Sequence, residues 1–232
     1  MWNHPSVQSM QSDETCLISE PRLKDSYQRC EDIGIERKLS IASDVLQGEK
    51  LSPFLEKHHR LACNANSLFF DTFRHLQDQK ALFILTDGVG RIITLSSKPE
   101  VLALAATHGI VVGASLSEAS LGTNAVSLAL HHAEPVVIRG QQHFCKIFAD
   151  WYCVAIPIIV TDGKPVACLD ISTCHEETLG DKLALANLLA TKIRNFLQNN
   201  QLESDDINIP VVSASQISTL TARQQQVLVL FS

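Results

Sequence analysis

Side chains that could bind a ligand gather between residues 118 and 157. Gly122, Thr123 and Asn124 stand directly before a helix-forming run at residues 125–130. Threonine and asparagine cap the free amides at the start of a helix, so this spacing predicts a helix N-terminus. Unpaired N–H groups and the positive end of the helix dipole meet there, which suits a carboxylate, a phosphate or a polar ligand atom. An ordinary capped helix has the same sequence, so both interpretations stay open.

A second group of side chains could hold a metal or carry redox chemistry. It comprises His143, Cys145, Cys153, Cys168, Cys174 and His175. Zinc sites usually have about two to four residues between paired ligands, whereas one residue separates His143 from Cys145 and none separates Cys174 from His175. Because cysteine is often fully buried, we expect Cys153 and Cys168 to fill the core, and we expect no metal site.

Motifs of hydrolysis and phosphoryl transfer are missing from the sequence. G-x-S-x-G, the Walker loop G-x-x-x-x-G-K-[ST] and H-E-x-x-H do not occur. We therefore expect no catalytic residues, no cofactor and no enzymatic activity. A thiol-based enzyme is the alternative, and it would need an exposed cysteine with a lowered pKa.

The elements that must position these side chains alternate between helical and strand patterns. Helical patterns cover residues 54–79, 98–108 and 179–197, and Ser52 with Pro53 forms the start signal of the first. Strand patterns form two hairpins, at residues 81–95 and 154–171, with turns of aspartate and glycine. Shorter strands are expected at residues 109–114 and at Val136. Two hairpins separated by helices predict an α+β domain, an antiparallel sheet flanked by long N- and C-terminal helices.

The first and last of these helices carry regular apolar seams. The seam positions are Leu55, Ala62, Ala65, Phe69, Thr72 and Leu76 in the first helix and Leu179, Leu183, Ala186, Ala190, Ile193 and Leu197 in the last. Such seams occur in bundles and coiled coils. The pattern fits a contact with a second copy as well as a cover for the chain's own sheet. We expect a homodimer.

Composition is typical of a globular domain. Hydrophobic residues make up 45% of the 232 residues and charged residues 19%. No apolar run is long enough to span a bilayer, no secretory signal opens the chain, and the seven cysteines lack the spacing of a disulfide framework. We therefore expect a cytoplasmic location with no membrane contact. The net charge of −6 and the scattered basic residues argue against direct nucleic-acid binding.

The order of several short motifs resembles the GAF sensor domain of one group of bacterial transcription activators. The motifs are Glu118, Gly122-Thr123-Asn124, Pro135-Val136, His143-Phe144 and Cys153 with Pro157. Residues 25–34 also look like the S-W-x-R-C-x-x-x-G segment of that group, with Tyr27 in place of tryptophan. The group comprises the sigma-N-dependent activators of the acetoin and dihydroxyacetone catabolism type, and the resemblance covers roughly residues 20–200.

This resemblance implies a function and a set of site residues. The chain would be a regulatory sensor region that binds a small metabolite or a regulatory protein and controls downstream output modules. DNA and sigma-N RNA polymerase would be contacted only through modules absent from this chain. A dimerisation module without ligand is a further alternative. The residues expected around the ligand, on the concave side of the sheet, are Glu118, Thr123, Asn124, His143, Phe144, Trp151 and Cys153.

The expected organisation has five parts. Residues 1–20 form a flexible leader, 21–50 an N-terminal docking segment, 51–200 the GAF-type sensor domain and 201–218 a linker. Residues 219–232 begin a truncated helix. They resemble the first helix of a LuxR-type helix-turn-helix, with glutamine in place of both glutamates, and they also fit a linker helix before a PAS or ATPase module.

Overall fold

The computed structural model describes residues 18–75, 80–173 and 179–206. Its helices are α1 (Glu20–Asp32), α2 (Leu51–Phe73), α3 (Pro99–Thr107), α4 (Glu118–Leu121), α5 (Ala125–His132) and α6 (Leu179–Asp206). Its strands are β1 (Leu82–Asp87), β2 (Ile92–Ser96), β3 (Val136–Arg139), β4 (Tyr152–Ile159) and β5 (Pro165–Thr173). The chain divides into compact units at residues 1–198 and 199–232. Residues 1–17 of the expected leader and the helix expected at 219–232 lie outside the described residues.

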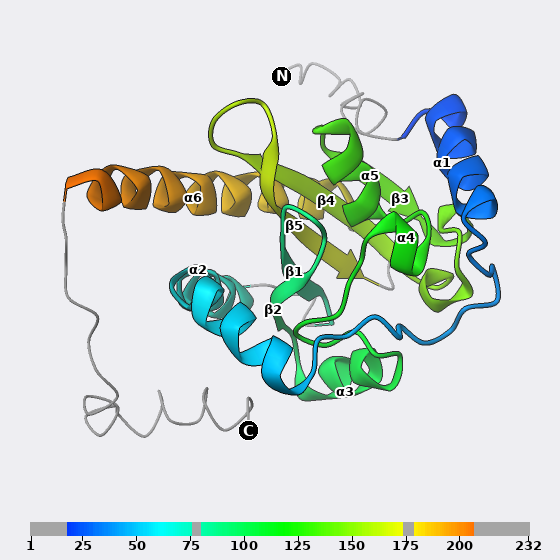
Figure 1. The fold of residues 1–232 in the computed structure, drawn as a ribbon, viewed down its shortest axis with the longest axis horizontal. Coiled ribbons are helices and arrows are strands. Elements are labelled where there is room, and N and C mark those ends of the chain that lie inside the picture. The colour runs from blue at the N-terminus through cyan, green and yellow to red at the C-terminus, as the bar shows by residue number, and fades with distance from the viewer. Residues whose placement is uncertain (1–17, 76–79, 174–178, 207–232) are drawn as a thin grey trace, which may run out of the picture. The chain divides into compact units, whose positions relative to one another are not determined.

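The described strands form an antiparallel sheet in the order β2-β1-β5-β4-β3 (Figure 1). Both predicted hairpins are confirmed, as β1 with β2 and as β4 with β5, and β1 pairs with β5 to join them. Side chains alternate between the two faces, so that Leu169 and Ile171 of β5 lie in one core cluster and Cys168 in the other. The predicted α+β fold is confirmed.

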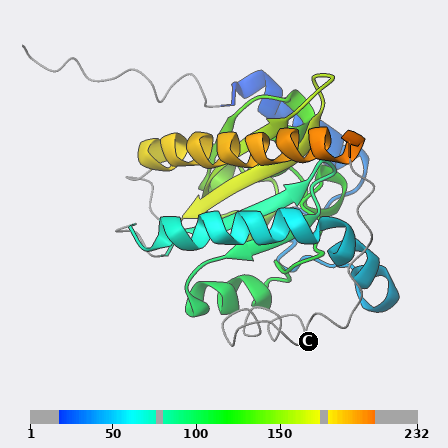
Figure 2. The same ribbon diagram turned by 90° about the vertical axis from the view of Figure 1, so that its left-hand side faces the viewer.

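Two long helices, α2 and α6, lie across one face of the sheet (Figure 2). Ala65 and Phe69 of α2 and Ala186, Ala190 and Ile193 of α6 are buried there among side chains from the strands. These are positions of the two apolar seams. The seams therefore cover the sheet of their own chain, which is one of the two roles that the pattern allowed.

The opposite face of the sheet is covered by α1, α3, α4, α5 and their connections (Figure 1). Leu23 of α1, Ala105 of α3 and Leu128 of α5 share one core cluster with Ile84 of β1. Elements far apart in the sequence therefore meet on this face, which also carries the candidate site.

Residues 109–113 form a turn and a bend, and Ala114 makes only an isolated β-bridge with Val45, so the strand predicted there is wrong. The apolar run after Gly109 favoured a strand, but Gly109 and Gly113 have φ angles of 73° and 85°, in the left-handed region. A Cβ atom at Gly109 would lie 2.5 Å from the carbonyl oxygen of Ala42. The backbone of the N-terminal segment thus packs directly on this glycine and fixes the turn.

Helix boundaries also differ from the prediction, and α2 ends at Phe73 although its helical pattern continued to residue 79. α2 begins at Leu51, so Ser52 lies inside the helix, and Pro53 is tolerated because N–H groups of the first turn have no partner in the helix. α6 continues to Asp206, so residues 201–206 of the expected linker are helical. Across the described stretches, none of the helices combines the length and apolar character of a membrane span.

Candidate functional site

Glu118 is the first residue of α4, and α1 supplies its partners. Arg29 donates two hydrogen bonds to the carboxylate, 2.8 Å from Nε to Oε2 and 2.9 Å from Nη2 to Oε1, and the Ser26 hydroxyl donates a third. Burial by itself raises the pKa of Glu118, but the hydrogen bonds from Arg29 and Ser26 outweigh burial and hold the pKa below its usual value. The carboxylate is therefore ionised and already paired within the chain.

Thr123 extends this network into the core. Its Oγ1 lies 2.7 Å from Ser26 Oγ and 3.4 Å from Cys30 Sγ, and all three residues are fully buried. Because the Ser26 hydroxyl donates its single proton to Glu118, Thr123 is the donor to Ser26. The motif formed by Ser26, Arg29 and Cys30 thus attaches α1 to the start of α4 and to the turn before α5.

Asn124 is the N-cap of α5, as the sequence predicted. Its Oδ1 accepts from the Ser127 amide at 3.0 Å, and Ser127 Oγ accepts from the Asn124 amide at 3.1 Å, which completes a capping box. Its Nδ2 donates at 2.9 Å to the carbonyl oxygens of both Leu116 and Gly122. The side chain therefore uses its donors and its acceptor inside the protein.

Phe144 is buried between the N-terminal segment and the turn before α5. Its ring centroid lies 5.7 Å from that of Tyr27, and the Arg37 guanidinium carbon lies 4.2 Å from its ring centroid. Gly122, with φ of 63°, permits this contact, since a Cβ atom there would lie 2.9 Å from Phe144 Cδ1. Phe144 thus helps to hold the N-terminal segment in place.

His143 is buried, and one of its two ring nitrogens forms a hydrogen bond. Its Nδ1 lies 2.9 Å from the Gly140 carbonyl oxygen, so Nδ1 carries the proton and donates, while Nε2 has no hydrogen-bond partner. Burial lowers the pKa of His143 to about 4 despite this hydrogen bond. The ring is therefore neutral near neutral pH, and its centroid lies 5.4 Å from that of Phe148.

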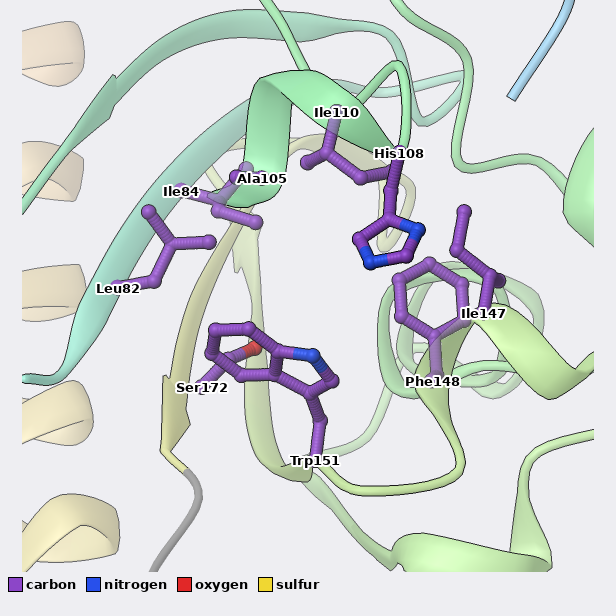
Figure 3. A pocket seen from close by; sticks show the side chains of 9 residues that line it. All are labelled: Leu82, Ile84, Ala105, His108, Ile110, Ile147, Phe148, Trp151 and Ser172. Atoms are coloured by element: carbon purple, nitrogen blue, oxygen red, sulfur yellow. The ribbon is translucent and has the colours of Figure 1, made fainter. Parts of the chain in front are cut away.

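A small cavity lies on the same side of the sheet, between the sheet, α3 and the segment before β4 (Figure 3). Its lining side chains are Leu82, Ile84, Ala105, His108, Ile110, Ile147, Phe148, Trp151 and Ser172. The space open to water centres is about 20 Å³, which is enough for about one water molecule. The walls are mainly apolar, with Ser172, His108 and Trp151 as the polar side chains.

A buried polar chain adjoins this cavity through Ser172. The Ser172 hydroxyl donates to Asp170 Oδ2 and lies 3.2 Å from Cys153 Sγ. Burial raises the pKa of Asp170 to about 7, although the hydrogen bond from Ser172 favours the ionised form. The sequence interpretation missed Asp170. An aspartate within the apolar strand pattern at residues 167–171 is the signal that could have found it.

The seven residues predicted around a ligand therefore occupy two places. Four of them attach the N-terminal segment or cap α5, namely Glu118, Thr123, Asn124 and Phe144. Trp151 lines the cavity, while His143 and Cys153 adjoin it through Phe148 and Ser172. Ligand contact by any of the seven stays a prediction. Within residues 18–75, 80–173 and 179–206, no three histidine, cysteine or acidic side chains are grouped as a metal site would require.

The sequence and the fold together identify the protein family. Residues 68–195, more than half of the chain, match the GAF domain family, and the chain belongs to that family. The structure of the Escherichia coli DhaR(N)–DhaL complex has the same fold, with a TM-score of 0.73 at 20% identity over 80% of this chain and 64% of that chain.

Two relatives are named as regulators of operons. The chain is 28% identical over 186 residues to the acetoin dehydrogenase operon transcriptional activator AcoR of Bacillus subtilis, which aligns 78% of this chain with 31% of that protein. It is 20% identical over 182 residues to the PTS-dependent dihydroxyacetone kinase operon regulatory protein of Escherichia coli, with 78% and 28% covered. The chain thus carries a GAF domain of the kind found in transcriptional regulators and spans less than a third of these relatives.

Proposed function

We propose that this chain is the sensor region of a bacterial transcription activator and that a small molecule binds on the α3 face of its sheet. The observation that carries this proposal is the cavity beside Trp151, because concave sites with apolar walls and a few polar groups are typical of small-molecule binding. The names of three relatives support a ligand of this size. They refer to acetoin, dihydroxyacetone and glycerol, which are small, uncharged and hydroxylated.

The cavity must open to admit such a ligand, since it has room for about one water molecule. Ile147, Phe148 and Trp151 lie on one short segment before β4 and form one of its walls. Displacing this segment is the smallest rearrangement that would enlarge the cavity. A ligand that binds the open arrangement better than the closed one would then shift the population toward it.

The segment that would move is bound to the N-terminal part of the chain. The amide of Lys146 donates to the carbonyl oxygen of Arg37 at 2.9 Å, and the amide of Ile147 donates to that of Leu39 at 3.0 Å. Ligand binding would therefore disturb the docking of residues 37–39 and of α1 before them. In the proposed activator, this change would be passed to output modules that contact DNA and RNA polymerase.

A protein partner is the second candidate for what the domain senses. The neighbour from Escherichia coli was solved in complex with DhaL, which favours a regulatory protein as partner. For self-association, the outward sides of α2 and α6 are the available surface, since their seams cover the sheet. Phe70 on α2 and Leu188 on α6 are 49% and 55% exposed and would contribute to a homodimer there.

Four of the described cysteines do not support the alternative of a thiol-based enzyme. Burial raises the pKa of Cys30, Cys63 and Cys168 above the usual value for a thiol, and it raises that of Cys145 to about 11. A reactive thiolate needs the opposite shift.

A thermal-shift screen of the full chain tests the small-molecule proposal. The panel comprises hydroxy-ketones, polyols, carboxylates and aromatic metabolites. A ligand at about a hundred times its Kd should add about 2.7 kcal/mol, or roughly 5 to 11 °C in Tm. Ala105 lines the cavity, whereas its neighbour Ala106 is exposed.

Ala105→Leu should therefore fill the cavity and abolish the shift, and Ala106→Leu should keep it. A ligand response that is equal in the two variants would place the binding site elsewhere. The lack of any response from the folded protein would leave a protein partner as the better proposal.

A further inference from the structure

Asp170 has a carboxyl group that is buried in the middle of the sheet and makes few polar contacts. It is 2% exposed, and its strand neighbours across the sheet are Ile84 on β1 and Ala155 on β4. Ser172 donates one hydrogen bond to Oδ2, and Oδ1 has no hydrogen-bond partner. Among the described residues, no lysine, arginine or histidine forms an ion pair with it.

A structural role does not explain this arrangement. Buried carboxyl groups that stabilise a fold are normally paired with a cation or hydrogen-bonded through both oxygens. An apolar residue would suit the surroundings of Asp170 better, since its strand neighbours are Ile84 and Ala155. A polar group that conflicts with its local environment is expected where a ligand completes its contacts.

Asp170 reaches the cavity beside Trp151 through its neighbours. Ile84, which is directly opposite Asp170 on β1, and Ser172, which hydrogen-bonds to it, both line that cavity (Figure 3). Ser172 Oγ also lies 3.2 Å from Cys153 Sγ, to which its single proton can be donated instead of to Asp170. Ser172 thus connects the buried Asp170 and Cys153 to the wall of the cavity.

The charges around this space limit what it can bind. No lysine or arginine lines the cavity, and the ring of His108 already bonds through Nδ1 to the carbonyl oxygen of Ser40 at 2.9 Å. A carboxylate ligand would bring a second negative charge next to Asp170 in a poorly hydrated site that no lysine or arginine lines. A neutral ligand with a hydroxyl group can donate to Asp170 Oδ1, which has no hydrogen-bond partner, without this repulsion.

We propose that Asp170, together with Ser172, is the polar end of the small-molecule site and makes the site select uncharged hydroxylated ligands over carboxylates of similar size. This inference rests on the proposed small-molecule function. It adds Asp170 as the residue that selects ligands by their charge. Asp170 is not among the seven residues predicted from the sequence.

The test compares matched probes by isothermal titration calorimetry on the full chain at about pH 8.5, where Asp170 is ionised because its pKa is about 7. The pairs are 1,2-propanediol with lactate, glycerol with glycerate, and dihydroxyacetone with pyruvate. The wild type should bind the neutral member of at least one pair about tenfold or more tighter than the carboxylate. Asp170→Asn keeps the shape of the side chain but removes the charge, so it should reduce that preference about tenfold. Ser172→Ala should weaken binding of the neutral member.

A matched control uses a buried hydroxyl on the other face of the sheet. Thr94 is buried and donates to Asn66 Oδ1 of α2 at 2.7 Å, so Thr94→Val should lower stability but leave ligand preference unchanged. An unchanged preference in a folded Asp170→Asn protein would overturn this inference and leave the proposed function standing. A wild type that binds the carboxylates better than the neutral probes would do the same. A wild type that binds none of these probes would overturn this inference, and the wider thermal-shift panel would then decide the proposed function.

Discussion

Replacing Asp170 with asparagine should make the stability of the protein depend less on pH. Complete burial raises the pKa of Asp170 from its ordinary value of 3.8 to about 7, and the hydrogen bond from Ser172 opposes this only in part. Asparagine has nearly the same shape, and its amide oxygen can accept the Ser172 hydroxyl. It does not titrate, so the substitution removes the proton-binding group and changes the packing little.

The sign and size of the effect follow from proton linkage. The unfolded chain loses this proton near pH 3.8, whereas the folded protein keeps it until about pH 7, so the folded state binds more protons in between. The stability that Asp170 contributes is therefore fully present below pH 3.8 and is lost as the pH rises through about 7. A shift of about three units corresponds to about 4 kcal/mol, of which about 2 to 3 kcal/mol is lost between about pH 5 and about pH 8.

His143 contributes a pH dependence of the opposite sign. Burial lowers its pKa from 6.5 to about 4, so the stability from its neutral ring is present above pH 6.5 and is lost as the pH falls toward 4. Both the wild type and Asp170→Asn contain this histidine. Subtracting their free energies of unfolding at each pH therefore isolates the effect of Asp170.

The assay is urea denaturation followed by circular dichroism at about pH 5 and about pH 8. The stability of Asp170→Asn relative to the wild type should increase by about 2 to 3 kcal/mol between these values. Asp44→Asn is the matched control, because Asp44 is exposed and its pKa is lowered by hydrogen bonds that outweigh burial. A relative stability of Asp170→Asn that stays constant across this range would refute the reasoning from burial.

Two further predictions concern the residues that hold α1 and α5. Arg29→Ala should lower the free energy of unfolding by about 1 to 2 kcal/mol, less than for a fully buried pair because the side chains of Arg29 and Glu118 are 35% and 20% exposed. Arg29→Ala should also speed proteolysis within α1. The control is Arg22→Ala, which breaks the exposed pair with Glu134 and should change neither stability nor proteolysis. Equal behaviour of the two variants would contradict the role given to Arg29. Asn124→Ala should cost about 2 kcal/mol in the same denaturation assay, because it removes a helix cap and leaves two carbonyl oxygens without their donor. A loss below about 0.5 kcal/mol would show that the cap is not needed.

Local patterns in the sequence determined the elements whose causes are local. The alternation of apolar residues and the turn at Asp87 to Gly90 predicted the first hairpin, and Asn124 predicted the start of α5. The strand predicted at residues 109–114 was wrong because its conformation depends on the backbone of Ala42, more than sixty residues earlier. That contact cannot be read from the local pattern.

The candidate site likewise depends partly on local sequence and partly on contacts between distant segments. The sequence placed seven residues in one ligand site because they lie close together along the chain and resemble a family motif. The tertiary structure brings Ser26 and Arg29 of α1 onto Glu118 and Thr123, so these polar groups already have partners within the chain.

Tertiary structure also showed how unusual the environment of Asp170 is. Within its strand it is one polar residue among apolar ones. Its significance depends on what neighbouring strands and helices place around it, because the energy of a carboxyl group is set by the burial and charges of its surroundings. The sequence therefore determined the family, the sheet and the capped helix, whereas long-range packing decided which polar side chains are already paired and left Asp170 buried with one oxygen that has no hydrogen-bond partner.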